Sequence, residues 1–313
     1  MSKHYLKFTV SSDWRLKEFS AGRDACRMKS IFVPEGIVCI GENAMFGVEC
    51  NKLIMPSTLK VIEGYAFKNA SIYEIDFGDC KLERIEHSAF ERCMARAELP
   101  DTVEYIGDYC DLDLEKEGKI KLPKALKYIG AISIDLDYAS EVELHESMIT
   151  SESNLVHWLH NRALVDDWVT LRVVRDGKEL YRFIHNERWR VDTSEGNYIG
   201  PQGMLYDHYD NNFKNITHKR CKALMAAYRL IWPIDLPERI EKKYRLYVKN
   251  NFSELIKGKE EDIETIRLLN DAGLISAFHL KKLLENAAKN KNVEIVAYLV
   301  DQLREIRAKS LEL

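Results

Sequence analysis

A tandem repeat organises the chain between Pro34 and Leu144. Its units open at regularly spaced residues, which are Pro34, Pro56, Gly78, Pro100 and Pro123. The period is therefore 22 or 23 residues. Repeats of this length stack as coils, because each unit buries its apolar face only against its neighbours. The sequence thus predicts a solenoid, whose function resides in the surface that the coils build.

The first part of each unit is a turn segment with an apolar residue in phase, namely Ile40, Ile62, Ile85, Ile106 and Ile129. Four residues later stands a small residue, which is Ala44, Ala66, Ala89, Cys110 or Ser133. A large side chain there would push close-packed coils apart. The next residue is Met45, Phe67, Phe90 or Ile134, but Asp111 in the fourth unit. We therefore expect a distorted fourth coil, in which phenylalanine replaces Asp111 without harm if that position faces the interior.

The second part of each unit is a short alternating strand, which we expect to stack into one parallel sheet. Along each strand, alternate side chains face the core, for example Leu53 and Ile75. The side chains between them point outward and form two columns across the sheet. One column reads Phe32, Ile54, Asp76, Glu98, Lys121 and Glu143, and the other reads Ser30, Lys52, Glu74, Arg96, Lys119 and Glu141. Like and unlike charges here either form a solvated ladder, in which Glu98, Lys121 and Glu143 support each other, or a docking surface.

The segments IEGYAFKNA and IEHSAFERC carry a resemblance to a known family. An Ile-Gly or Ile-Glu turn, an Ala-Phe pair and a Cys three residues further on resemble the BspA-type leucine-rich repeat of bacterial proteins. The resemblance covers about Lys29 to Glu146 and implies a leucine-rich repeat solenoid. It also implies a protein-interaction role, and many proteins with this repeat are surface adhesins. The Ala-Phe pair is lost in the fourth and fifth units.

The remaining chain predicts further domains around the solenoid of residues 31–146. Residues 1–30 would cap the first coil through Trp14, Leu16 and Phe19. Residues 147–204 form a connector, with a β-hairpin around Asp176 and Gly177. Residues 205–313 are all-helical, with a capping box at residues 235–238. Their span HLKKLLENAAKNKNVEIVAYLVDQ resembles an ankyrin repeat. The fold class is thus an α/β repeat solenoid, a hairpin connector and an all-α ankyrin-like domain.

Composition favours a cytoplasmic protein. The net charge of −4 argues against a nucleic-acid partner, and no long apolar run indicates a membrane span. The first residues lack the apolar region of a secretory signal. Seven scattered cysteines, without a C-x-x-C pair, are typical of a reducing compartment. Cys93 and Cys110 occupy interior columns, so we expect both to be buried and unpaired.

Few residues suggest chemistry. His157, His160 and Asp207 offer a metal-binding or hydrolytic alternative, although no hydrolase, nucleotide-binding or zinc-protease motif is present. The lysine-rich helix around Tyr244 and Tyr247 suggests RNA only weakly, because an amphipathic helix that buries its aromatic residues explains it better. We therefore predict no enzyme activity, no cofactor and no bound metal.

The sequence therefore favours a non-enzymatic scaffold that binds a protein partner through the strand face of the solenoid. That face has an apolar end and an acidic middle. The residues expected to bind the partner are Phe32, Ile54, Glu74, Asp76, Arg96, Glu98 and Lys121. The alternatives are the metal-binding or hydrolytic protein and a surface adhesin.

Overall fold

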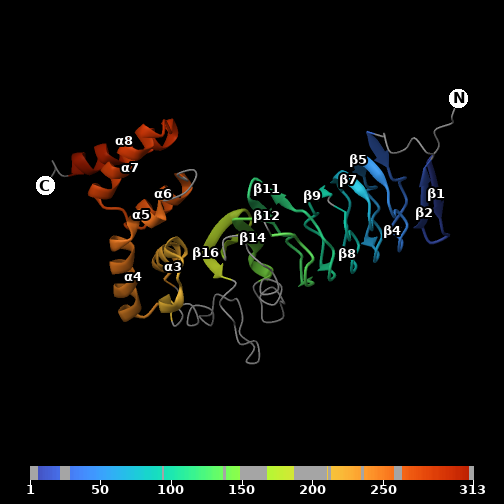
Figure 1. The fold of residues 1–313 in the computed structure, drawn as a ribbon, viewed down its shortest axis with the longest axis horizontal. Helices are drawn as coiled ribbons and strands as arrows, with labels where there is room; N and C mark the ends of the chain where they lie inside the picture. Colours follow the sequence, from blue (N-terminus) through green and yellow to red (C-terminus); the bar gives the residue numbers. More distant parts are fainter. Residues whose placement is uncertain are drawn as a thin grey trace. The chain divides into compact units, whose positions relative to one another are not determined.

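The computed structural model describes residues 6–21, 29–93, 95–136, 139–148, 168–186, 210, 213–233, 236–256 and 263–309. The chain divides into two compact units, Met1–Leu205 and Tyr206–Leu313. The first unit contains the strands of the solenoid and the second contains helices (Figure 1). This is the predicted fold class, a solenoid of parallel strands followed by a helical region.

The turn segments of the repeat form one side of the solenoid. Their strands pair in parallel and are β4 (Cys39–Ile40), β6 (Val61–Ile62), β8 (Arg84–Ile85), β10 (Tyr105–Ile106) and β13 (Tyr128–Ile129). An antiparallel hairpin of β1 (Leu6–Val10) and β2 (Arg15–Ala21) closes the N-terminal end of this sheet. Leu16 pairs with Ile40 and is fully buried, so it covers the open end as expected. Trp14, which was expected to do the same, is 57% exposed.

The strand face begins as predicted and then breaks. The strands β3 (Ser30–Phe32), β5 (Glu49–Ile54), β7 (Ser71–Asp76) and β9 (Arg96–Ala97) form a parallel four-stranded sheet. A second sheet contains β11 (Glu115–Lys116), β12 (Lys119–Lys121), β14 (Glu141–His145), β15 (Trp168–Arg175) and β16 (Lys178–Asn186). The prediction of a single sheet is therefore wrong. Arg96 forms an isolated bridge with Asp113 instead of pairing with Lys119.

The fourth coil causes this break. In the first three coils a left-handed residue, Gly47, Asn69 or Arg92, stands three residues after the small residue. In the fourth coil Asp111 has this conformation (φ 58°) directly after Cys110, so the turn is two residues shorter. The chain uses its remaining residues for the hairpin β11–β12, whose turn residues Glu117 and Gly118 also have positive φ.

Asp111 consequently does not occupy the place of Phe67 and Phe90. It is exposed, and its carboxylate accepts a hydrogen bond from the Arg92 amide at 3.2 Å. Leu112 fills the interior instead. The expected distortion of the fourth coil is confirmed, but phenylalanine at position 111 would lie in solvent with a strained backbone.

The interior columns pack as the repeat predicts. The in-phase isoleucines and the small residues that follow them are at most 2% exposed. Phe67 and Phe90 stack in parallel, with ring centroids 4.9 Å apart. The coils approach so closely at Gly130 that a Cβ atom there would lie 2.3 Å from the Asp108 amide nitrogen. Close contact between neighbouring coils is therefore the main source of cohesion in this unit.

The predicted hairpin after the repeat is confirmed. Asp176 and Gly177 both have positive φ, as a two-residue turn between β15 and β16 requires. Strand β15 pairs in parallel with β14 and places Leu171 beside Val142, both fully buried. The hairpin therefore continues the solenoid sheet beyond the last repeat. A short 3-10 helix, η2 (Glu146–Met148), follows β14.

Among its described residues the helical unit contains the 3-10 helix η4 (Phe213–Asn215) and the α-helices α3 (Lys219–Ile231), α4 (Glu238–Asn250), α5 (Phe252–Leu255), α6 (Ile263–Asp271), α7 (Ala277–Lys289) and α8 (Val293–Lys309). His218 and Ser276 cap α3 and α7. The predicted capping box before α4 is wrong, because Pro237 is the N-cap and its side chain accepts no hydrogen bond.

A buried polar cluster anchors α4 in this unit. The Tyr244 hydroxyl donates to Asp210 at 2.5 Å, and the same carboxylate pairs with Arg229 at 2.9 Å. Tyr244 is fully buried. It therefore cannot stack on a nucleic-acid base, which removes half of the aromatic pair that suggested RNA.

Stability measurements can test the packing of the aromatic column. We expect Phe67→Ala and Phe90→Ala each to lower the free energy of unfolding by about 3–5 kcal/mol, because each empties a close-packed site. Phe46→Ala is the matched control, since that ring is 54% exposed. Urea denaturation of the three variants measures the effect. Equal losses in all three would contradict the assignment of the interior column.

Thiol labelling tests the burial of Cys93 and Cys110. Both are free and almost fully buried, and burial raises their pKa from 9.0 to about 11 and about 12, respectively. We expect neither to react with iodoacetamide until the protein is denatured, which serves as the positive control. Because the thiols ionise more easily in the unfolded chain, stability should also fall as pH rises past 9.0. Fast labelling of either native thiol would contradict this assignment.

Candidate interaction surface

The outward columns of the strand face lie in the predicted register as far as β9. Ser30, Lys52, Glu74 and Arg96 are successive strand partners, and so are Phe32, Ile54 and Asp76. Phe32 is 65% exposed, whereas Ile54 beside it is half-buried. The expected apolar end of the surface thus consists mainly of one aromatic ring.

Ion pairs connect the charged part of these columns. Lys52 Nζ lies 2.9 Å from Glu74 Oε1 and 2.9 Å from Asp76 Oδ2, so one cation serves two carboxylates. The hydrogen bond from Lys52 holds the pKa of the Asp76 carboxyl below its ordinary value. Arg96 lies 3.7 Å from Asp113 and also over the ring of Tyr73. This part of the face is a charge ladder with an excess of acid.

A groove of about 1130 Å³ lies where the two sheets separate. Its walls come from the ends of β7 and β9 on one side and from β11, β12, β14 and β15 on the other. Five of the seven predicted binding residues line it, namely Glu74, Asp76, Arg96, Glu98 and Lys121. Phe32 and Ile54 are not among its lining residues. The break in the sheet therefore gathers most of the predicted site into one concavity.

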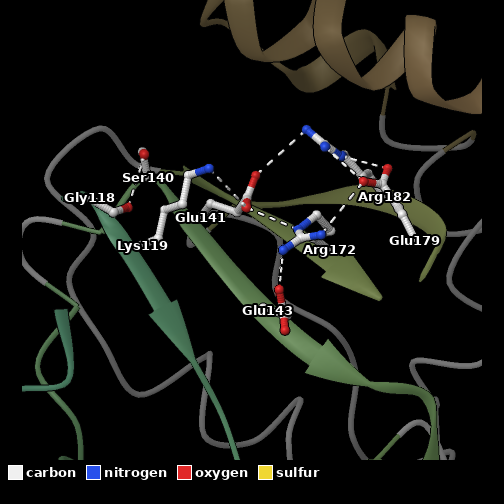
Figure 2. Close-up of polar contacts among 8 residues, drawn as sticks. All are labelled: Gly118, Lys119, Ser140, Glu141, Glu143, Arg172, Glu179 and Arg182. Atoms are coloured by element: carbon white, nitrogen blue, oxygen red, sulfur yellow. Dashed lines mark hydrogen bonds and ion pairs between the residues drawn. The ribbon is translucent and has the colours of Figure 1, made fainter. Parts of the chain in front are cut away.

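The wall formed by the second sheet is held by a network of charges (Figure 2). Arg172 pairs with Glu141 at 3.1 Å and also with Glu143. Glu141 in turn lies 3.6 Å from Arg182, which pairs with Glu179 at 2.7 Å. These side chains are at least three-quarters buried. The network therefore joins β14, β15 and β16 into one rigid wall.

The predicted ladder of Glu98, Lys121 and Glu143 forms only in part. Lys121 and Glu143 are strand partners, but Lys121 pairs with Asp101 at 3.5 Å. Glu98 lies outside any strand and forms no ion pair with another described residue. Reasoning from the repeat also missed Tyr73, Asp113 and Arg172, which line the groove. The alternation in WVTLRVVR is the signal that points to Arg172, but only if this segment is known to extend the sheet.

The groove carries more acid than base. Nine carboxylates line it, against five basic side chains. Within the described part of the chain, three of these carboxylates form no ion pair: Glu98, Glu115 and Glu117. Among the basic side chains of the groove, Lys116 also forms none with a described residue. Glu115 accepts a hydrogen bond from the Gly118 amide. A surface with this balance attracts cations and repels anionic partners.

The metal-binding alternative stays a prediction. His157, His160 and Asp207 lie outside the described residues. Within the described ranges, no group of three or more potential ligand side chains is placed to hold a metal ion. Likewise, none of the helices that the structure describes has the length and apolar character needed to cross a bilayer.

Arg172→Met tests whether the charge network supports the groove wall. Methionine keeps the apolar stem but leaves Glu141 and Glu143 without their shared cation, so we expect a loss of about 1–3 kcal/mol of unfolding free energy. Arg175→Met is the control, because Arg175 lies on the same strand, its side chain is 59% exposed and its pair with Glu146 should contribute little. Urea denaturation measures both. A harmless Arg172→Met would mean that the network does not stabilise the wall.

Comparisons with known proteins agree with the repeat. Residues 23–136 match the model of the BspA type leucine rich repeat region in six copies. Two solved structures are similar to parts of the chain. The pneumococcal vaccine antigen PcpA is 18% identical, with a TM-score of 0.35 over 47% of this chain and 49% of that one. The T. pallidum leucine rich repeat protein TpLRR is also 18% identical, with a TM-score of 0.33 over 51% of this chain and 78% of that one. The chain thus spans about half the length of PcpA. No curated protein matches it. The family match confirms the leucine-rich repeat part of the prediction, and it ends before the helical unit.

Proposed function

We propose that this chain is a non-enzymatic scaffold that binds a protein partner through the strand face of its solenoid. The observation that carries the proposal is the groove of about 1130 Å³ in that face, lined by five residues that the repeat singled out beforehand. Solenoids commonly bind through the extended surface that their stacking creates. The family match adds support, because leucine-rich repeats commonly mediate protein interaction or adhesion.

The surface offers two kinds of contact. Phe32 provides an exposed ring at the edge strand of the four-stranded sheet, with Ile54 beside it. Burying such a ring contributes roughly 1.5–3 kcal/mol to binding. The charges of Glu74 and Asp76 act mainly on the association rate and the choice of partner. The apolar contact thus anchors the partner, and the acidic part selects it.

Two finer features belong to the same proposal. We place the protein in the cytoplasm, because all six described cysteines are free. We also propose an ankyrin-like arrangement for α7 and α8. A tight turn at Lys291 (φ 59°) joins these helices, and the Asn292 amide donates to the Ala287 carbonyl at 3.0 Å.

The test uses a tagged full-length chain to capture partners from the native host. Mass spectrometry identifies the captured protein, and its binding is then measured with purified components. We expect Phe32→Ser combined with Ile54→Ser to abolish binding, because the pair loses its apolar contact. Glu74→Lys combined with Asp76→Lys should weaken binding, and the loss should depend on salt.

Phe46→Ser is the matched control, because Phe46 is similarly exposed but lies in a turn outside the strand face. Circular dichroism first establishes that each variant is folded. If the purified partner binds both double variants with wild-type affinity, the strand face is not the binding site.

A further inference from the structure

We propose that the groove in the strand face accepts an extended, lysine- or arginine-rich segment of the partner, which adds as a strand to the open backbone edge beside Glu98 and Leu99. This inference rests on the proposed function and names the chemistry of the partner. It comes from two independent features of the groove, its unpaired backbone groups and its charge.

The backbone feature is a hydrogen bond that recurs along the strand face and then stops. The amide after each outward residue donates to the carbonyl of the next strand: Val33 to Ile54 at 2.9 Å, Met55 to Asp76 at 2.9 Å and Leu122 to Glu143 at 3.1 Å. The equivalent bonds, Phe77 to Glu98 and Leu99 to Lys121, do not form. Neither amide donates to any other described residue. The ladder is therefore open at two consecutive steps.

These open groups lie in the groove itself. Phe77, Glu98, Leu99 and Lys121 are all lining residues. Phe77 and Leu99 are almost fully buried as residues, and their amides have no partner among the described residues. An amide left unpaired at a buried residue costs free energy that a hydrogen bond from a partner recovers. An extended peptide supplies carbonyls and amides at the spacing of a sheet, as in other cases of strand addition.

The charge feature selects the kind of peptide. Most cations of the groove are already paired within the protein: Arg96 with Asp113, Lys121 with Asp101, and Arg172 with Glu141 and Glu143. Glu98 and Glu117 have no such cation, and Glu74 and Asp76 share one lysine. Side chains that alternate along a strand would bring every second residue of the peptide towards these carboxylates. Lysine or arginine at those positions completes the pairing.

The experiment uses the full chain and a defined probe. The probe is a fluorescein-labelled peptide of alternating lysine and threonine, about six residues long, which is a typical strand length. Fluorescence anisotropy measures its binding. Two comparison peptides separate the two features: one replaces lysine with glutamate, and the other keeps lysine but carries N-methyl groups that remove its backbone donors.

We expect the lysine peptide to bind and the glutamate peptide not to bind. The N-methylated peptide should bind about tenfold more weakly, because it loses the ladder hydrogen bonds that its amides would donate. Glu98→Gln combined with Glu117→Gln should lower the affinity for the lysine peptide about tenfold, since two carboxylates are replaced by neutral amides. Glu42→Gln combined with Glu49→Gln is the matched control, because these carboxylates are exposed outside the groove.

Amide hydrogen exchange locates the bound strand. We expect exchange at Leu99 to slow when the lysine peptide binds. Unchanged exchange at Leu99, or equal binding to the Glu98→Gln, Glu117→Gln variant, would overturn the proposal, because the peptide would then bind by diffuse attraction elsewhere.

The outcome for the proposed function is read separately. Suppose that a natural partner depends on Phe32 and Ile54 for binding, but that the lysine peptide shows no groove-dependent binding. This result overturns only the identity of the occupant. Groove-dependent peptide binding supports the occupant. If no captured partner then depends on the strand face, the scaffold function fails instead.

Discussion

The structure of the first unit depends on the close contact of each coil with the next. Ala66 and Ala89 are fully buried, and they leave room for the rings of Phe67 and Phe90 to stack at 4.9 Å. Each coil packs only against the coils next to it, so its geometry is set by that of its neighbours. A coil whose length differs must therefore either disrupt the stack or accommodate the difference on its own surface. The fourth coil does the second.

That accommodation creates the only large departure from the repeat in the strand face as described. The shorter turn at Asp111 preserves the interior, because Cys110, Leu112 and Ile106 are all buried. The displaced residues form β11, which pairs antiparallel with the repeat strand β12, and β9 is left at the edge of the four-stranded sheet. The packing that holds the solenoid together is thus satisfied, and the backbone ladder on its surface is what the chain gives up.

Sequence reasoning predicted the periodic features and failed where the period changes. The columns of Ile62, Ala66 and Leu53 follow from spacing, because every coil repeats the same burial. The left-handed backbone at Asp111 was not predictable from spacing. An aspartate in an apolar column is equally compatible with an unchanged backbone that tolerates a polar side chain there. The role of Arg172 was also missed, because its position in the sheet depends on β15 pairing with β14, a contact that no repeat signals. The burial of Tyr244, by contrast, follows from the amphipathic pattern of its helix, but its hydrogen-bond partner Asp210 does not.

The groove therefore differs from an ordinary charged surface in how its two walls are made. One wall consists of repeat strands, whose outward residues are fixed by the stacking of the coils. The other is held by Arg172 between Glu141 and Glu143, and these carboxylates are neutralised within the protein (Figure 2). On this second wall Glu115 and Glu117 remain without an ion pair among the described residues, and on the first wall Glu98 does so next to the open amide of Leu99. Because charge and unpaired backbone coincide there, a basic extended segment satisfies both at once, whereas a folded basic surface would satisfy only the charge.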